Sequence, residues 1–287
     1  DMARLRRPIA VSLADFHFRA TQRSRSTGRF ESESVMATTS LNGWWCQVFG
    51  SSVQDKLSMG QQRTLAVGGI TKEVVEPIVR RLQQRLELFE GGLVLGVCHN
   101  DLLCANVMRS VAHATVEPHV AAAEGEEQLA LIDFEYACKN YVLYDFANHF
   151  NEYCGLLCDY DACFPTDEVM LDAVLAYRKA IRTLLLKQAA TTEANTFDRC
   201  PFSPAEVRAF GLELENPHCS DNDEEELRAA HVWVRHVKLL TLVSHGIWTA
   251  WSILQAAHSV IDFDFASYAV QRWSQLIKTL DSFDSAC

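Results

Sequence analysis

Apolar residues recur at helical spacing in several long stretches of the chain. Residues 71–90 carry them on a single face, with the charged residues mostly on the other, which predicts an amphipathic helix. Residues 227–258 are apolar around much of the helical circumference, which predicts a largely buried helix. Further helices are predicted over residues 7–17, from about 165 to 185, and over 268–280.

Two short apolar runs predict strands instead. Residues 93–97 and 129–132 are rich in leucine and β-branched side chains, and runs of this length are typical of buried strands. Each run ends in a cluster of polar residues. Acids and amides at the end of a strand lie at the rim of a sheet, so we expect these two clusters to be accessible to a ligand.

The remaining segments carry little periodicity. Residues 19–69 are rich in Ser, Thr, Gly and Gln, which predicts a low-complexity insertion or a partly disordered surface segment. Further insertions are expected at about 112–128 and 191–226, where Ala, Glu, His, Pro and acidic residues predominate. We therefore expect a first helical region over 1–18, the insertion, and a main domain over 70–287.

Composition narrows the class of protein. The chain has 287 residues, of which 48% are hydrophobic, so it can bury a large core. Its formal net charge of −11 argues against a nucleic-acid surface. No apolar run reaches the roughly 18 residues of a membrane span. The ten cysteines are scattered without a Cys-x-x-Cys pair, which indicates reduced thiols and a cytoplasmic location.

The polar clusters after the two predicted strands contain a recognisable spacing. His99-x-Asp101-x-x-x-x-Asn106 is the catalytic-loop pattern of kinases, and the pair Asp133-Phe134 after the later strand is their metal-binding pattern. Asp101 suits the group that orients an acceptor hydroxyl and takes its proton, and the oxygens of Asn106 and Asp133 suit Mg²⁺. The alternative is a polar turn and a strand cap, which the combination of both motifs makes improbable.

A second candidate feature is aromatic. Trp248 and Trp251 lie on one face of the predicted 227–258 helix, and Tyr268 follows close behind in the chain. Aromatic faces of this kind can enclose a cationic amine. From spacing alone, an ordinary aromatic stripe in the core is the favoured interpretation.

Five segments together resemble the choline/ethanolamine kinase family. In chain order they are CHNDLLCAN (98–106), LIDFEYACKNY (131–141), YDFANHFNEYCG (144–155), SHGIWTAWSILQA (244–256) and IDFDFASYAVQR (261–272). RPIAVSLADFH resembles the helix that follows the hinge between the two lobes of that family. The match covers most of residues 72–280, apart from the insertions.

The resemblance implies a role for each of these residues. Asp101 becomes the catalytic base, Asn106 and Asp133 the Mg²⁺ ligands, and His99 and Asp145 structural supports of the loop. The residues implied to line an amine pocket are Tyr136, Glu152, Trp248, Trp251 and Tyr268. This reverses the preference for a plain aromatic stripe. ATP is then the co-substrate, a small amino alcohol the acceptor, and a homodimer the expected assembly.

Within the family, the details favour ethanolamine kinases. HNDLLCAN and NHFNEYCG resemble them, whereas choline kinases usually place a polar residue near Leu103 and Cys-Glu-Trp where this chain has Asn151-Glu152-Tyr153. A primary ammonium carries three N–H donors, so Asn151 beside the pocket is expected to favour it. The implied reaction is ATP-dependent phosphorylation of ethanolamine for phosphatidylethanolamine synthesis. The alternatives are a choline kinase and an aminoglycoside-phosphotransferase-like enzyme, though the latter gives no reason for the paired tryptophans.

The expected fold is α+β and protein-kinase-like, mainly the helical C-terminal lobe. The family also has an N-terminal lobe of antiparallel strands bearing an ATP-contacting lysine. About twenty residues precede the 19–69 segment, and none of them predicts such a sheet. We therefore expect the N-terminal β lobe to be absent or truncated, and the rival function from another class is a catalytically impaired, amine-binding fragment.

Overall fold

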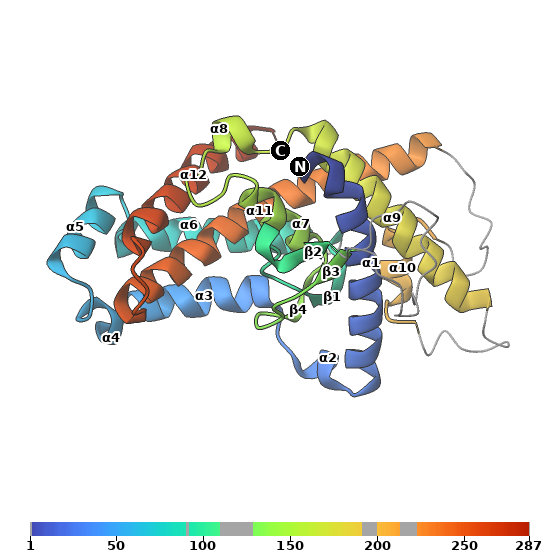
Figure 1. The fold of residues 1–287 in the computed structure, drawn as a ribbon, viewed down its shortest axis with the longest axis horizontal. Coiled ribbons are helices and arrows are strands. Elements are labelled where there is room, and N and C mark those ends of the chain that lie inside the picture. The colour runs from blue at the N-terminus through green and yellow to red at the C-terminus, as the bar shows by residue number, and fades with distance from the viewer. Residues whose placement is uncertain (1, 90–91, 110–128, 191–199, 213–222, 287) are drawn as a thin grey trace. The chain divides into compact units, whose positions relative to one another are not determined.

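The computed structural model describes residues 2–89, 92–109, 129–190, 200–212 and 223–286 (Figure 1). The chain divides into two compact units, each assembled from three segments that are distant in sequence. Unit 1 consists of Asp1–Glu33, Val94–Asp145 and Pro165–Arg235, and unit 2 of Ser34–Leu93, Phe146–Phe164 and His236–Cys287.

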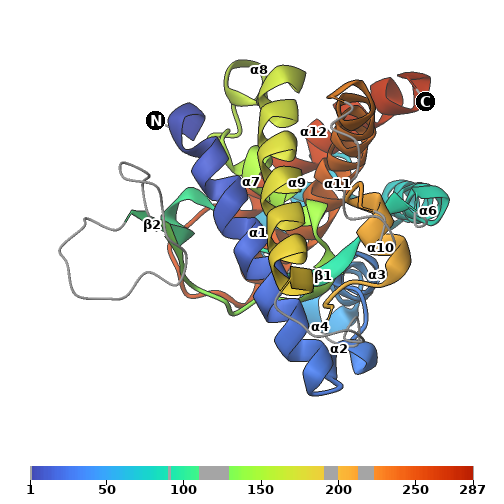
Figure 2. The ribbon, with the colours of Figure 1, turned by 90° about the vertical axis from the view of Figure 1, so that its right-hand side faces the viewer.

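Unit 1 combines helices with two small antiparallel sheets. Its elements are α1 (Met2–Ser26), α2 (Arg29–Ser32), β1 (Leu95–Cys98), a 3-10 turn (Cys104–Asn106), β2 (Val107–Arg109), β3 (Leu129–Leu131), β4 (Cys138–Tyr141), α9 (Asp167–Ala190) and α10 (Pro204–Ala209). Strand β1 pairs with β4, and β2 pairs with β3. Helix α1 lies alongside α9 and also contacts β1 and β3 (Figure 2).

The packing of α1 follows from a stripe at helical spacing. Ile9, Leu13 and Phe18 are buried, and so is the polar His17 on the same face. Helix α9 buries a matching stripe that includes Tyr177. The apolar residues of both stripes are almost fully withdrawn from water, so their contact contributes to the hydrophobic stabilisation of unit 1.

Among the described residues of unit 2, all of the regular secondary structure is helical, with no strands. It contains α3 (Met36–Val48), α4 (Ser51–Gln54), α5 (Met59–Val67), α6 (Lys72–Phe89), α8 (Tyr160–Cys163) and α12 (Phe265–Ala286). Helices α7 (Leu143–Glu152) and α11 (Asp223–His258) begin in unit 1 and continue into unit 2. Helix α11 is long and apolar enough to cross a membrane, but 83% of its apolar window is buried in protein, as in a core helix.

Gly246 of α11 marks the centre of the unit 2 core. A Cβ atom at this position would meet Leu41 of α3 at 3.0 Å, Leu82 of α6 at 3.5 Å and Leu276 of α12 at 3.6 Å. All three leucines are fully buried or nearly so. The missing side chain therefore lets three helices approach α11 at the same point, at the close-packed density of a protein interior.

The structure differs from the sequence analysis over residues 19–69. Helix α1 continues to Ser26, and α2 to α5 follow, with Phe30, Leu41, Trp45 and Leu65 among their buried residues. The expectation of a low-complexity or disordered segment is therefore wrong for its secondary structure. Most of these helices have only 4 to 13 residues, so no long apolar period is visible, and tertiary packing rather than local pattern stabilises them.

The other predicted elements compare more simply. The helix predicted over 71–90 is α6, the 227–258 helix is α11, and the predicted strands are β1 and β3. The insertion expected at 112–128 lies outside the described residues, as do 191–199 and 213–222 of the later one. Between these last two gaps, helix α10 forms, and a capping box of Ser203 and Glu206 caps its N-terminus. The division of the chain into 1–18, 19–69 and 70–287 stays a prediction.

Candidate active site

One buried carboxylate accepts hydrogen bonds from the backbone of the loop after β1. Asp145, in the first turn of α7, is fully buried. Its two oxygens accept hydrogen bonds from the backbone N–H groups of His99 and Asn100, each at 2.7 Å. Asn100 has a φ of 68°, a left-handed conformation that is uncommon outside glycine. The two hydrogen bonds thus fix the backbone of the residues that directly precede Asp101.

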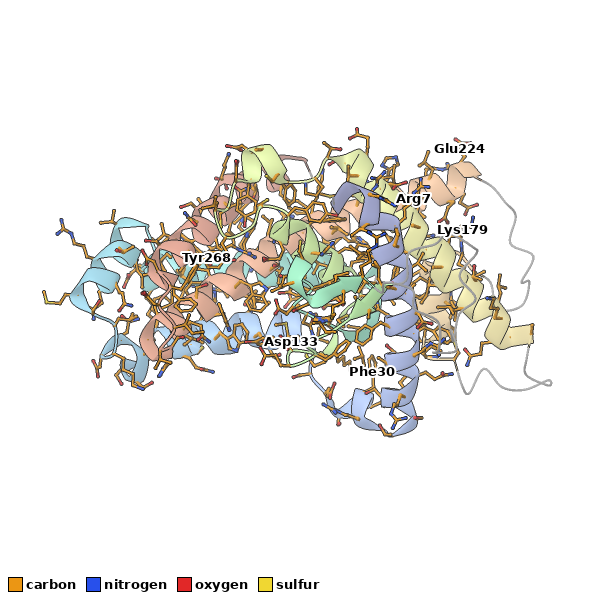
Figure 3. The ribbon with its side chains drawn as sticks, viewed as in Figure 1. Arg7, Phe30, Asp133, Lys179, Glu224 and Tyr268 are labelled. Carbon is orange, nitrogen blue, oxygen red and sulfur yellow. The ribbon has the colours of Figure 1, made fainter. Side chains whose placement is uncertain are left out.

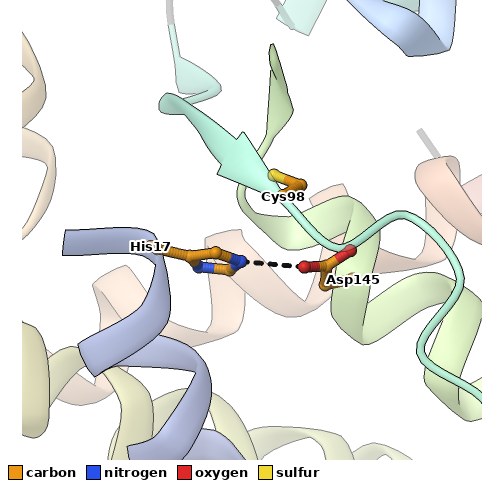
Figure 4. A group of neighbouring side chains, drawn as sticks. All are labelled: His17, Cys98 and Asp145. Carbon is orange, nitrogen blue, oxygen red and sulfur yellow. Dashed lines mark hydrogen bonds and ion pairs between the residues drawn. The ribbon is translucent and has the colours of Figure 1, made fainter. Parts of the chain in front are cut away.

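His17 of α1 completes this support. Its Nε2 lies 2.9 Å from Asp145 Oδ2, and its Nδ1 lies 2.9 Å from the hydroxyl of Tyr177 on α9 (Figure 4). Burial by itself raises the pKa of Asp145, but the hydrogen bond and charge of His17, with the charge and N–H group of His99, outweigh it and lower that pKa. Asp145 is therefore held as a carboxylate, the form that accepts hydrogen bonds on both oxygens.

His17, Cys98 and Asp145 place three possible metal-ligating atoms within 4.8 Å of one another (Figure 4). Both nitrogens of His17 and both oxygens of Asp145 are already engaged within the protein. Burial raises the pKa of the Cys98 thiol well above its usual range, and that thiol lies 3.4 Å from the carbonyl oxygen of Tyr141. A metal needs a thiolate and free ligand atoms, so the group is a structural support rather than a metal centre.

The segments that carry Asp101, Asn106 and Asp133 are joined by hydrogen bonds. Asn106 Nδ2 donates to the carbonyl of Asp101 at 2.9 Å, which leaves the amide oxygen of Asn106 outside that bond. The N–H of Ile132 donates to the carbonyl of Asn106 at 3.0 Å, and β2 pairs with β3 directly beyond. His99 Nε2 lies 2.8 Å from the carbonyl oxygen of Ile132. The loop and the start of the Asp133 segment are therefore immediate neighbours.

Asp133 itself is exposed and has a φ of 63° (Figure 3). The residue after it, Phe134, stacks on Phe16 of α1 at 5.3 Å between ring centroids and lies 5.1 Å from the ring of His99. This aromatic packing anchors the turn that presents the Asp133 carboxylate. Carboxylate and amide oxygens are the ligands that Mg²⁺ prefers, so the donor set of Asn106 and Asp133 fits that ion.

The backbone of Tyr136 also lies beside the loop after β1. Asn100 Nδ2 donates to the carbonyl of Tyr136 at 2.9 Å, and Asn140 Nδ2 donates to Asn100 Oδ1 at 2.7 Å. The side chain of Asn100 therefore ties the loop to the chain between Asp133 and β4. Sequence reasoning missed this role of Asn100, because its partners are 36 and 40 residues away.

The other predicted pocket residues belong to unit 2. The indoles of Trp248 and Trp251 on α11 meet edge to face at 5.4 Å, and Trp251 meets Phe265 at the start of α12 at 5.8 Å. The ring of Phe263 packs against Phe265 at 4.9 Å and against Tyr268 at 5.8 Å. The three predicted aromatic residues therefore belong to one continuous aromatic cluster.

Glu152, at the end of α7, is tied to the same cluster. Its Oε1 accepts a hydrogen bond from Arg272 at 2.9 Å, and Arg272 also donates to the hydroxyl of Tyr268 at 3.1 Å (Figure 3 marks Tyr268). Sequence reasoning missed Arg272, whose position in YAVQR gave no signal of a buried charge. It also missed Trp44 of α3, whose ring lies 6.3 Å from that of Trp248.

The structure gives Asn151 a different task from the one expected. Its side chain is 1% exposed, and its Nδ2 donates to the carbonyl of Thr241 on α11 at 3.1 Å. That bond joins α7 to α11 within unit 2. Asn151 therefore contributes to the packing of these helices, and the expectation that it selects the amine stays a prediction.

The fold and the loop define a kinase-like protein, and comparisons with known proteins specify the family. The family described as choline/ethanolamine kinase matches residues 2–277. Ethanolamine kinase 1 of Mus musculus is 28% identical over 235 residues, covering 77% of this chain and 52% of that protein. Ethanolamine kinase 2 of Rattus norvegicus is 31% identical over 207 residues, covering 72% of this chain and 40% of that protein.

The solved structure of an ethanolamine kinase from Plasmodium vivax has the same fold, with a TM-score of 0.63 and 21% identity over 99% of this chain and 61% of that one. The chain belongs to the choline/ethanolamine kinase family. It spans about half the length, or less, of the curated relatives named above.

Proposed function

We propose that the protein is an ethanolamine kinase that transfers the γ-phosphoryl group of ATP to the hydroxyl of ethanolamine, giving phosphoethanolamine for phosphatidylethanolamine synthesis. One observation carries the proposal: the backbone of Asn106 is hydrogen-bonded to Ile132, so the loop with Asp101 and the turn with Asp133 form one junction. This arrangement supports a single phosphoryl-transfer site.

In the proposed reaction, Asp101 accepts a hydrogen bond from the ethanolamine hydroxyl and takes its proton as the oxygen attacks the γ-phosphorus. The bond between the γ-phosphorus and the bridging oxygen breaks, and ADP leaves. The amide oxygen of Asn106 and the carboxylate of Asp133 would hold Mg²⁺, which neutralises charge on the phosphates when bound. Asp145 and His17 keep the loop in place throughout, so little reorganisation is needed at the moment of transfer.

Recognition of the amine is assigned to unit 2 and to Tyr136. An ammonium group that leaves water needs a negative partner and π faces, and Glu152 with the cluster of Trp248, Trp251 and Tyr268 supplies both kinds of group. Relatives named ethanolamine kinase and the NHFNEYCG segment support ethanolamine as the acceptor. A cytoplasmic location and a homodimer remain predictions that accompany this function.

The rival substrate is choline, which shares the chemistry and differs in the head group. The two are separated by kcat/KM for ethanolamine and for choline, measured with Mg²⁺ and ATP on the protein expressed from its complete open reading frame. We expect a preference for ethanolamine of at least tenfold, the factor that about 1.4 kcal/mol produces. A clear preference for choline would overturn the ethanolamine assignment, although the kinase assignment would stand.

A further inference from the structure

Arg272 of α12 is a buried cation at the proposed amine site. Its side chain is 1% exposed, whereas that of Glu152 is 17% exposed. The two N–H groups of Nη1 donate hydrogen bonds to Glu152 Oε1 at 2.9 Å and to the hydroxyl oxygen of Tyr268 at 3.1 Å. Nη2 lies 3.3 Å from Ser244 Oγ on α11, one helical turn before Trp248. The partners of Arg272 thus include two proposed amine-site residues and a neighbour of a third.

A guanidinium can fix several groups at once. It is planar and permanently charged, and it presents N–H donors in fixed directions. Glu152 is a long side chain that would otherwise sample many rotamers, and the bond to Arg272 engages one of its two carboxylate oxygens. Tyr268 accepts from Arg272 through its hydroxyl, which holds its ring at a set angle. Groups fixed in advance do not have to be immobilised when a ligand binds.

We propose that Arg272 is a positioning residue for amine binding: it holds the Glu152 carboxylate and the Tyr268 ring in place before the amine arrives. This inference rests on the proposed function, since Glu152 and Tyr268 are assigned to the amine there. Arg272 does not touch the substrate in this account. Its contribution is to remove the cost of ordering the two side chains that do.

A comparable ion pair elsewhere in the chain provides the matched control. Arg178 of α9 is also 1% exposed and donates to both oxygens of Glu226, at 2.8 and 3.0 Å. It also donates to the carbonyl of Ala209 at 2.8 Å. None of these partners is assigned to the amine. Loss of Arg178 should therefore cost stability much as loss of Arg272 does, without a direct effect on the amine.

The test is isothermal titration of the protein, expressed from its complete open reading frame, with ethanolamine, combined with thermal unfolding of each variant. For Arg272→Met we expect ethanolamine to bind about tenfold more weakly, as expected when one or two side chains must be immobilised on binding. Arg272→Lys keeps the charge and should bind with intermediate affinity. Arg178→Met should lower the unfolding temperature by a similar amount and leave the Kd for ethanolamine within about twofold of the unaltered chain.

The outcomes separate the two proposals. If the unaltered chain binds neither ethanolamine nor choline, the proposed function and the positioning role both fail. If it binds ethanolamine and Arg272→Met matches Arg178→Met in Kd, Arg272 is structural only and the proposed function stands. Should Arg272→Met not fold, Tyr268→Phe decides: it removes only the hydroxyl that Arg272 holds. Its effect must then be non-additive with that of Arg272→Lys, and additive effects would overturn the inference.

Discussion

Asp145 joins parts of the chain that are far apart in sequence, so a substitution of this residue should affect several elements at once. It accepts the N–H groups of His99 and Asn100 and contacts His17 on α1. A buried charge that loses its partner is strongly destabilising, because the remaining polar groups stay buried without compensation. The residue therefore supports both the stability of unit 1 and the geometry of the loop that bears Asp101.

Asp145→Asn should lower the free energy of unfolding by about 3–5 kcal/mol, the usual result of breaking a buried pair from one side. Urea unfolding followed by circular dichroism measures this. Asp161→Asn is the control, because Asp161 pairs with Lys278 at an exposed position, at 2.6 Å. Its effect should stay within about 0.5 kcal/mol. Equal losses of unfolding free energy for the two substitutions would show that the buried hydrogen bonds of Asp145 stabilise the protein no more than an exposed ion pair does.

The same carboxylate predicts a pH dependence. The pKa of Asp145 is lowered in the folded protein, so its contribution to stability is complete above roughly pH 5 and is lost as the pH falls through the lower folded value. The difference in unfolding free energy between the unaltered chain and Asp145→Asn should shrink as the pH falls below about 5, because Asp145 then becomes protonated. A difference that grows in acid would contradict the assignment.

At the residue scale, spacing identified some groups and not others. The segments of Asp101, Asn106 and Asp133 could be singled out because their pattern is local and each motif follows a recognisable strand, whereas the roles of the three residues stay predictions. His17 and Arg272 could not, since their partners lie 128 and 120 residues away in the chain. A histidine on an apolar helix face and an arginine near a helix middle look ordinary until the fold brings a carboxylate to them.

At the scale of elements, length decided what could be predicted. Helices α6 and α11 show their apolar periods over 18 and 36 residues. Helix α7 was missed although Leu143, Phe146, Ala147 and Phe150 recur at helical spacing, because a helix of ten residues is too short for this period to stand out among the polar residues between them. Its polar residues, such as Asp145 and Asn151, are paired with other parts of the protein. Short helices therefore leave no long apolar pattern in the sequence.

The contact between α5 and α12 offers a test at this scale. A Cβ atom at Gly68 would come within 2.5 Å of Val270, so Gly68→Ala should destabilise the protein by about 1–3 kcal/mol through overpacking. Among the described residues, and apart from the backbone of its own helix, a Cβ atom at Gly60 of α5 would meet only Ser58 Oγ, at 3.9 Å. Gly60→Ala should therefore be neutral or slightly stabilising. Thermal unfolding of both variants gives the comparison, and similar effects would disprove the close approach.

At the scale of the whole molecule, the order of the motifs indicated the family, and the comparisons confirmed it. The two units could not be predicted, because each is assembled from three separate segments of the chain. Asp101, Asn106, Asp133 and Tyr136 lie in unit 1, whereas Glu152, Trp248, Trp251 and Tyr268 lie in unit 2. The proposed function assigns a role to both sets, so only a measurement of turnover tests them together.

The most direct test is ³¹P NMR of the protein, expressed from its complete open reading frame, with ATP, Mg²⁺ and ethanolamine. We predict the phosphoethanolamine signal with the unaltered protein, and a rate lower by roughly 10²–10⁴-fold with Asp101→Asn, the usual contribution of a positioned base. Circular dichroism should show that the variant is folded. Absence of phosphoethanolamine with the unaltered protein, or equal rates for the two proteins, would contradict the account.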